Sequence, residues 1–327
     1  MAAYIARRFV YMIVTLALVS VVGFIVIDLP PGSYLDFYIS QLESQGTSTS
    51  ESQVETIKRQ YGLDQPGYVQ YWKWITGFVR GKFGRSFLYN ADIGELIWGR
   101  IGYTVLISTV SLFLTWLIAI PIGIYSATHQ YSAGDHVFTI IGLAGVSVPN
   151  FMLALVLMVV ASQFLGQDVS GLFSRPYVDA PWSWGKFVDL LKHLWVPLIV
   201  IATGGTAGLM RMMRGNLLDI INMQYIQAAR ARGLPESQVI IKHAVRNAVH
   251  PLIMLLGTSF PAIISGAMVI SIVLSLPTTG PLYFNALQQK DMYLAVTFLM
   301  FLSIMLVIGN FLADMLLAWI DPRIRYE

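Results

Sequence analysis

The chain has no cysteine among its 327 residues, so disulfides, thiolate metal sites and cysteine nucleophiles are all excluded. Charge is scarce as well, because Asp, Glu, Lys and Arg make up only 12% of the residues, against roughly a quarter in soluble proteins. The net charge is +3, and no basic stripe is interleaved with aromatic residues. We therefore expect no nucleic-acid partner and no thiol chemistry.

The sequence also lacks the motifs of nucleotide binding and of hydrolysis. No G-x-x-x-x-G-K-[ST] sequence is present to bind nucleotide phosphates, and H-E-x-x-H and G-x-S-x-G are missing. Among the five histidines, His243 and His250 are seven residues apart and fall near one helical face. Histidines at a membrane boundary more often pack or contact headgroups than bind metal. We therefore expect neither a metal site nor serine hydrolase chemistry.

Apolar residues are what the sequence has in abundance. They make up 56% of the chain, and the mean hydropathy is +0.64, a surplus that one soluble core of this length cannot bury. Because about 20 apolar residues cross a bilayer as a helix, the runs predict an all-α membrane protein with six transmembrane helices. The predicted spans are Phe9–Ile27, Tyr103–Ala127, Val137–Gln167, Leu194–Met210, the first part of Pro251–Gln289, and Met292–Ile320.

The first span follows Arg7 and Arg8. A signal peptide is the alternative interpretation, but the apolar run is long for one and no A-x-A-like cleavage site follows it. We expect a retained span, so that residues 1–29 form an N-terminal segment, residues 30–102 an insertion, and residues 103–327 a core with five spans.

The insertion at residues 30–102 is polar and aromatic and is predicted to be extracytoplasmic and helical. Pro30–Gly32 cannot continue a helix, Ser48–Ser52 begins a short capped helix, and Gly62–Pro66 forms a turn. The ring-rich stretch that follows is predicted to lie along the outer membrane interface, with a solute vestibule as the alternative. Its residues are Tyr68, Tyr71, Trp72, Trp74, Ile75 and Phe78.

Several residues inside the spans predict how these spans pack. Pro121 and Pro149–Asn150 free backbone groups that neighbouring protein or water must satisfy, so both spans are expected inside a bundle. Gly204–Gly205 permits close helix approach or a bend. Asp314 is interpreted as a structural carboxylate near the inner end of the sixth span, with a proton relay as the alternative. Pro277–Pro281 divides the fifth run into a span and an outer hairpin.

Six crossings place both termini on one side of the membrane, and basic residues indicate which side this is. Segments on the side of the termini carry ten Lys and Arg residues, and the two short opposite loops carry four. By the positive-inside rule, we expect both termini in the cytoplasm. The ten are Arg7, Arg8, Arg211, Arg214, Arg230, Arg232, Lys242, Arg246, Arg323 and Arg325, and the four are Arg175, Lys186, Lys192 and Lys290.

The stretch Asn216–Pro251 is the longest charged interval between apolar runs in the second half of the chain. Gly233 can end a helix in the left-handed conformation, and Pro235 suits the first turn of the next helix, which predicts two amphipathic helices hinged at Gly233. The expected apolar faces are Leu217, Ile221, Tyr225 and Ala228 on the first helix, and Val239, Ile240, Ala244 and Ala248 on the second.

Such a hinged element fits a groove on another protein, and the alternative is a basic loop held by anionic lipid headgroups. The sequence Gln227-Ala228-Ala229-Arg230-Ala231-Arg232-Gly233 favours the first interpretation. It resembles the EAA loop of ABC importer permeases, with Gln227 where the name-giving Glu usually stands.

Along nearly its whole length the chain resembles the dipeptide/oligopeptide/nickel branch of these permeases. Ser275–Pro281 departs from the aromatic-Pro-Gly pattern expected there and is similar to family members associated with oligosaccharides. The matching pieces are Arg7–Phe9, Tyr61–Pro66, Gly81–Ser86, Gln227–Gly233, His243–Asn247 and Asp321–Arg325.

The resemblance implies a fold like that of type I ABC importer permeases, with a cytoplasmic coupling-helix loop, in a bacterial or archaeal inner membrane. It implies a second homologous permease, two cytoplasmic ATPases that bind ATP and Mg²⁺, an extracytoplasmic solute-binding protein and membrane lipid as partners. This chain itself would catalyse nothing and bind no cofactor. The residues expected to contact the ATPase are Tyr225, Gln227, Ala228, Ala229, Arg230, Arg232, Gly233, Leu234, Pro235 and Glu236.

The leading hypothesis is therefore a permease subunit of an ATP-driven importer for short peptides or oligosaccharides. Asp314 and the broken spans motivate an alternative, an ion- or proton-coupled secondary transporter or channel. A membrane scaffold that only docks a partner through the loop is a third hypothesis.

Overall fold

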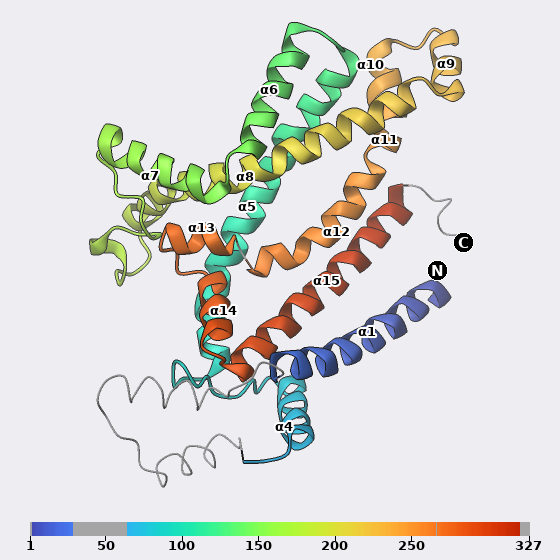
Figure 1. Cartoon of the computed structure of the whole chain (residues 1–327). Coiled ribbons are helices and arrows are strands. Elements are labelled where there is room, and N and C mark those ends of the chain that lie inside the picture. The colour runs from blue at the N-terminus through green and yellow to red at the C-terminus, as the bar shows by residue number, and fades with distance from the viewer. Residues whose placement is uncertain (1, 29–63, 266, 321–327) are drawn as a thin grey trace. The chain divides into compact units, whose positions relative to one another are not determined.

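The computed structural model describes residues 2–28, 64–265 and 267–320 (Figure 1). Within these residues every regular element is a helix, and β-pairing is limited to one bridge between Arg85 and Asp92. Five helices are long and apolar enough to cross a membrane, and a bent pair adds a sixth crossing if it is counted as one span. The all-α membrane fold is thereby confirmed. The expectations for Pro30–Gly32, Ser48–Ser52 and Asp321–Arg325 lie outside the described residues.

The chain folds into two compact units. The first contains Met1–Gly102 and Thr279–Val307, and the second contains Tyr103–Thr278 and Ile308–Glu327. The first unit therefore holds residues both from the predicted insertion and from the region 103–327. Its helices are α1 (Ala2–Asp28), α4 (Gly67–Val79), the start of α5 (Ile93–Thr128), α14 (Thr279–Gln288) and the first part of α15 (Met292–Ile320).

Helix α4 is the ring-rich stretch of the sequence, and one of its faces is a protein core. Trp74 is 4% exposed, packs with Phe24 of α1 and Val296 of α15, and donates from its indole nitrogen to Thr297 Oγ1 at 3.0 Å. Trp72, on the opposite side, is 63% exposed. The expected boundary helix therefore keeps only part of its rings at the surface, because the helical repeat turns the others inward.

A buried carboxylate fixes the loop between α4 and α5. Asp291, just before α15, is fully buried and accepts hydrogen bonds from Ser86 Oγ at 2.5 Å and from the Leu88 amide at 3.1 Å. The Leu294 amide donates to it at 3.3 Å. Burial raises the pKa of Asp291, while these donors act in the opposite direction. Ser86, the last residue of the stretch Gly81–Ser86, thus has a structural role as a hydrogen-bond donor to Asp291.

Replacing Asp291 by Asn is expected to destabilise the folded chain by about 1–3 kcal/mol, because the new amide group turns a donor toward buried donors. The midpoint of thermal unfolding of the purified protein measures this loss. Asp219→Asn is the matched control, since Asp219 is an exposed carboxylate on α8. Equal midpoints for the two variants would contradict the anchoring role.

The second unit is built around α8, a helix of 38 residues. Both α6 and α7 pack on α8, as do α11 and α12 (Figure 1). Its helices are the rest of α5, α6 (Ala133–Ser147), α7 (Asn150–Leu165), the 3-10 turn η1 (Arg175–Tyr177), α8 (Trp184–Ile221), α9 (Gln224–Ala231), α10 (Glu236–Gln238), the π-helix η2 (Val239–Ala244), α11 (Val245–Ala248), α12 (His250–Ser265), α13 (Met268–Val273) and the rest of α15.

The third predicted span, Val137–Gln167, is not one straight helix. It consists of α6 and α7, which are bent by 98° at Val148 and Pro149 (Figure 1). Val148 has ψ 122° and Pro149 has ψ 132°, both outside the helical region. A proline disfavours the helical conformation of the residue before it and lacks the N–H that would continue the ladder.

The expectations for the proline and glycine residues inside the spans had different outcomes. Helix α5 runs through Pro121 without a break, but Pro121 is exposed, so the residues that the structure describes do not provide the expected packing around it. A Cβ atom on Gly204 would lie 2.7 Å from Asn150, and one on Gly205 would lie 3.0 Å from Thr115. The close approach predicted at this glycine pair is thereby confirmed.

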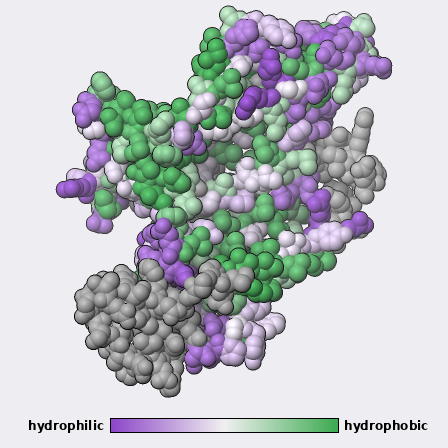
Figure 2. Space-filling view, viewed as in Figure 1, coloured by the Kyte–Doolittle hydropathy of each residue, from purple (hydrophilic) through white to green (hydrophobic). Residues whose placement is uncertain are grey.

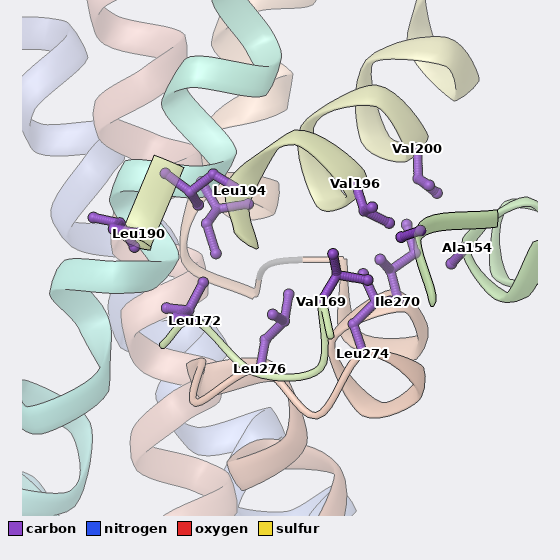
Figure 3. Close-up of a cluster of buried hydrophobic side chains, with 12 residues drawn as sticks. Ala154, Val169, Leu172, Leu190, Leu194, Val196, Val200, Ile270, Leu274 and Leu276 are labelled. Atoms are coloured by element: carbon purple, nitrogen blue, oxygen red, sulfur yellow. The ribbon is translucent and has the colours of Figure 1, made fainter. Parts of the chain in front are cut away.

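The fourth span is longer than the predicted Leu194–Met210, because α8 begins ten residues earlier, at Trp184, and ends at Ile221. A buried apolar cluster surrounds its first half (Figure 3). In this cluster Leu194 and Val196 of α8 meet Val169 and Leu172 of the preceding loop, and α7 and α13 complete it. The cluster secures the loop between α7 and α8 to the first half of α8.

The last two spans follow the prediction closely. Residues His250–Val273 are apolar enough to cross a membrane, and they include α12 and α13. The expected hairpin after Pro277–Pro281 contains a helix, α14. Helix α15 continues past Asp314 to Ile320, as predicted. That Asp314 is a structural carboxylate stays a prediction.

Candidate functional site

The candidate site is the short-helix region at the C-terminal end of α8, comprising residues 224–248 and here called the α9–α11 module. Helix α8 ends at Ile221, and α9, α10, η2 and α11 follow before α12 begins at His250. Hydrophilic residues gather over this end of the second unit, as Figure 2 shows. The module therefore has the surface character that the sequence predicts.

The hinge lies at Gly233, as predicted. Gly233 has φ +74°, in the left-handed region, and its amide donates to the Arg230 carbonyl at 2.9 Å. No atom lies within 4 Å of where a Cβ atom would be, so the backbone angle and not crowding requires glycine. Pro235 directly precedes α10 instead of lying in its first turn.

The predicted apolar face of the first helix is confirmed for two of its four residues. Leu217 is fully buried and Ile221 packs against the same apolar cluster, but Tyr225 and Ala228 are exposed. Helix α8 stops at Ile221 and α9 starts anew at Gln224, so residues before and after this break do not share a face. In α9 the buried side chains are Ile226 and Ala229. A break of two residues is enough to rotate the pattern, because the helical repeat is short.

The core of the module is continuous with that of α8. Ile226 is fully buried and belongs to the same apolar cluster as Met213 and Leu217 of α8. On the later part of the module, Val239, Ala244 and Ala248 are fully buried too, which confirms three of the four predicted residues; the fourth, Ile240, is half-buried. Burial of this kind joins the module to the long helix as one packed body.

Three polar contacts brace the module. Arg230 binds Glu236 across the hinge, with Nη2 2.7 Å from Oε1 and Nε 3.1 Å from Oε2. The hydrogen bond from Arg230 lowers the pKa of Glu236. Asn247 Nδ2 donates to Tyr225 Oη at 2.7 Å, and Asn216 Nδ2 of α8 donates to the Ala248 carbonyl at 3.2 Å.

Most residues expected to contact an ATPase lie on the outside of the module. The hinge at Gly233 lies among these residues, and the exposed residues form one surface around the hinge. Tyr225, Gln227, Ala228, Arg232, Gly233, Pro235 and Glu236 are exposed, Arg230 and Leu234 are half-buried, and Ala229 is buried. Ala229 is thus available for packing on α8 and not for a partner.

The Arg230–Glu236 pair is expected to contribute only about 0.2–1 kcal/mol, because both side chains are partly solvated. A double-mutant cycle with Arg230→Gln and Glu236→Gln, read by thermal unfolding, measures the coupling. Since the folded-state pKa of Glu236 is lowered, this contribution should be present at neutral pH and be lost as the pH falls through that pKa. A coupling that grows in acid would contradict the pairing.

A second brace, which the sequence did not reveal, ties α6 to α8. Asp135 at the start of α6 is 3% exposed and accepts a hydrogen bond from Arg214 Nη2 at 2.9 Å and from the Tyr131 amide at 3.0 Å. The two ionic partners are 79 residues apart. Only the arrangement of α6 on α8 brings them together, and no local spacing could have indicated it.

An apolar cavity of about 410 Å³ lies at mid-length of three spans in the second unit. Ser108, Thr115 and Ser259 place hydroxyl groups in an otherwise apolar wall. Thr115 and Ser259 donate to carbonyls of their own helices, at 2.9 Å and 2.8 Å. The wall is formed by Ser108, Leu112, Thr115 and Trp116 of α5, Ile201, Gly205, Gly208, Leu209 and Met212 of α8, Leu255, Ser259, Ala262 and Ile263 of α12, and Ala267.

In the part of the chain that the structure describes, no group of three His, Cys, Asp or Glu residues lies close enough to hold a metal ion. The exposed turn at Gly233 follows the helix α8, and residues of α8 line the cavity.

Comparison with known proteins covers nearly the whole chain. Residues 119–326 match the family described as binding-protein-dependent transport system inner membrane component. Residues 1–108 match the N-terminal region described for the membrane component of the same kind of transport system.

Individual relatives align from end to end. The chain is 35% identical over 327 residues to the oligopeptide transport system permease protein AppB of Bacillus subtilis, covering 100% of both chains. It is 32% identical over 326 residues to a putative peptide permease protein of Brucella ovis, covering 99% of both. It is 28% identical over 365 residues to the peptidoglycan transport system permease protein YejB of Agrobacterium fabrum, covering 100% of this chain and 99% of that one.

Proposed function

The chain belongs to the family of binding-protein-dependent transport system inner membrane components, and from this we propose that it is the permease subunit of an ATP-driven importer of short peptides. The braced, exposed hinge at Gly233 is the observation that carries the mechanical part of the proposal. The peptide part rests on the relatives, which include permeases of oligopeptide and peptidoglycan transport systems.

In the proposed assembly two cytoplasmic ATPase subunits bind ATP and Mg²⁺, and each permease inserts its α9–α10 turn into a groove on one of them. The chain has no phosphate-binding loop of its own. Closure of the ATPases would move the module, and the shared core of Ile226 and Leu217 would carry the movement into α8. Both termini would then be cytoplasmic.

A second, homologous permease and an extracytoplasmic solute-binding protein complete the proposed transporter. Pro121 is exposed on the span α5, and a partner helix could satisfy the backbone that it frees. Binding-protein dependence is part of the description of the family. The solute-binding protein would supply the selectivity.

We propose that the apolar cavity is part of the solute path. Its wall has small residues, Gly205 and Gly208, and hydroxyl groups that bond to their own helices. A wall of this kind offers few hydrogen bonds to the backbone of a peptide, so a peptide solute would move along the wall without being held tightly.

Peptides are the favoured solutes, because the relatives named above are described as peptide or peptidoglycan permeases. None of these three descriptions mentions oligosaccharides. A proton- or ion-coupled transporter is disfavoured by the family. A pure scaffold leaves the mid-span cavity without a role.

Reconstitution tests the function. Proteoliposomes with this chain, its second permease, its ATPases and its binding protein should take up labelled tri- to pentapeptides only when ATP is supplied. Uptake driven by a proton gradient in liposomes without the ATPases would instead support a secondary transporter. A lack of any uptake, with all subunits present and a peptide bound to the binding protein, would contradict the transport role.

A further inference from the structure

A cationic pocket with an aromatic floor lies in the first unit. Its volume is about 220 Å³. Three cationic side chains line the pocket: Lys73 of α4, and Lys82 and Arg85 of the loop that follows α4. Trp74 and Phe83, 4% and 9% exposed, contribute rings to the wall. Gly84 and Tyr293 complete the lining.

The positive charge of this pocket has no ionic partner among the residues that the structure describes. In the described part of the chain, the ammonium groups of Lys73 and Lys82 make no hydrogen bond or ion pair, and the two residues bond only through their backbone groups. Arg85 donates from Nε and Nη2 only to the neutral Asn90 carbonyl, at 3.1 Å and 2.8 Å. Three cations around one hollow repel one another, so an anion bound between them would be stabilised.

The position of the pocket along the spans matches the depth of lipid headgroups. Trp74 packs against Phe24, with ring centroids 5.9 Å apart, and Phe24 lies four residues from the end of α1. Tyr293 is the second residue of α15. The pocket therefore lies at the ends of two spans, where the hydrocarbon core gives way to headgroups.

The exposed side of α4 has the composition of a membrane boundary. Trp72 is 63% exposed and Val79 is 81% exposed, and both are close in sequence to the cations. Exposed aromatic and apolar side chains beside Lys and Arg are typical of helices that lie at the interface of a bilayer.

We propose that this pocket binds the phosphate of an anionic phospholipid, with Lys73, Lys82 and Arg85 contacting the phosphate oxygens and the rings contacting the glycerol side of the headgroup. A planar guanidinium and two ammonium groups suit a phosphate oxygen cluster. The bound lipid would fasten α4 to the membrane surface beside α1 and α15.

Native mass spectrometry of the intact transporter, released from nanodiscs of phosphatidylcholine with one-fifth phosphatidylglycerol, tests the site. The variant K73Q/K82Q/R85Q should retain about tenfold less phosphatidylglycerol than the wild type. The control R80Q/K192Q removes two exposed cations outside the pocket and should retain it fully. The charge-preserving variant K73R/K82R should retain it too.

Several results would each overturn the proposal. These are equal lipid retention by the wild type and the triple variant, loss of lipid from the control or the charge-preserving variant, equal retention of phosphatidylcholine, and displacement of the lipid by inorganic phosphate at about 10 mM, which would indicate a site for free phosphate. Unchanged lipid together with weaker docking of the binding protein in the triple variant would also overturn it, and would assign the cations to carboxylates of that partner. Thermal unfolding of each variant checks that the fold is kept.

Discussion

Replacing Gly233 by Val is expected to lower ATP-driven uptake by about tenfold or more while the chain still inserts into the membrane. Gly233 has φ +74°, and a β-branched residue in this conformation costs about 1–3 kcal/mol. The strain is relieved if the hinge rearranges, which separates Arg230 from Glu236 and reorients the surface offered to the ATPase. Uptake into proteoliposomes measures the effect.

The matched control at the same position is Gly233→Asn. Asn has a side chain of about the size of Val but is not β-branched and tolerates the left-handed conformation, and no atom lies within 4 Å of the Cβ position to obstruct it. Uptake should stay within about threefold of the wild type. If Val and Asn reduced uptake equally, the side chain and not the backbone would matter, and the hinge would have to be abandoned as the explanation.

The second large effect is expected from Gly208→Trp. Gly208 lines the mid-span cavity, and no atom lies within 4 Å of its Cβ position, so the helix α8 can accept a side chain there. Tryptophan carries the bulkiest of the natural side chains, and its indole would project into a cavity of about 410 Å³ and narrow it. We expect uptake to fall about tenfold or more while ATP hydrolysis by the partners continues.

Gly215→Trp provides the control for the cavity. Gly215 is exposed on the same helix, also has an open Cβ position, and does not line the cavity. This variant should transport at nearly the wild-type rate. A Gly208→Trp protein that transports as well as the Gly215→Trp protein would contradict a solute path through the cavity.

Features that depend on local chemistry were predictable from the sequence. Long apolar runs identified the spans, since the length that crosses a bilayer is fixed. The φ of Gly233 followed from its place between an amphipathic helix and Pro235. The close packing at Gly204–Gly205 followed from the missing side chains.

Features that depend on a short break in a helix or on long-range contacts were not predictable in this way. The break between Ile221 and Gln224 turned Ile226 inward in place of Tyr225, although the helical pattern looked continuous. The burial of Trp74 in α4 depends on its neighbours in α1 and α15. Partners such as Ser86 and Asp291 are 205 residues apart, and no spacing rule relates them.

The measurement that most directly tests the central claim is site-specific cross-linking from the α9–α10 turn. The chain has no cysteine, so Ala228→Cys introduces one thiol on the exposed surface of α9. In the purified transporter, a thiol-specific photo-cross-linker at this position should yield an adduct of the size of the permease plus one ATPase, and its amount should change when ATP is added. Val178→Cys, 54% exposed in the loop between α7 and α8, should yield none. An ATPase adduct from Val178→Cys but not from Ala228→Cys would contradict the coupling role of the turn.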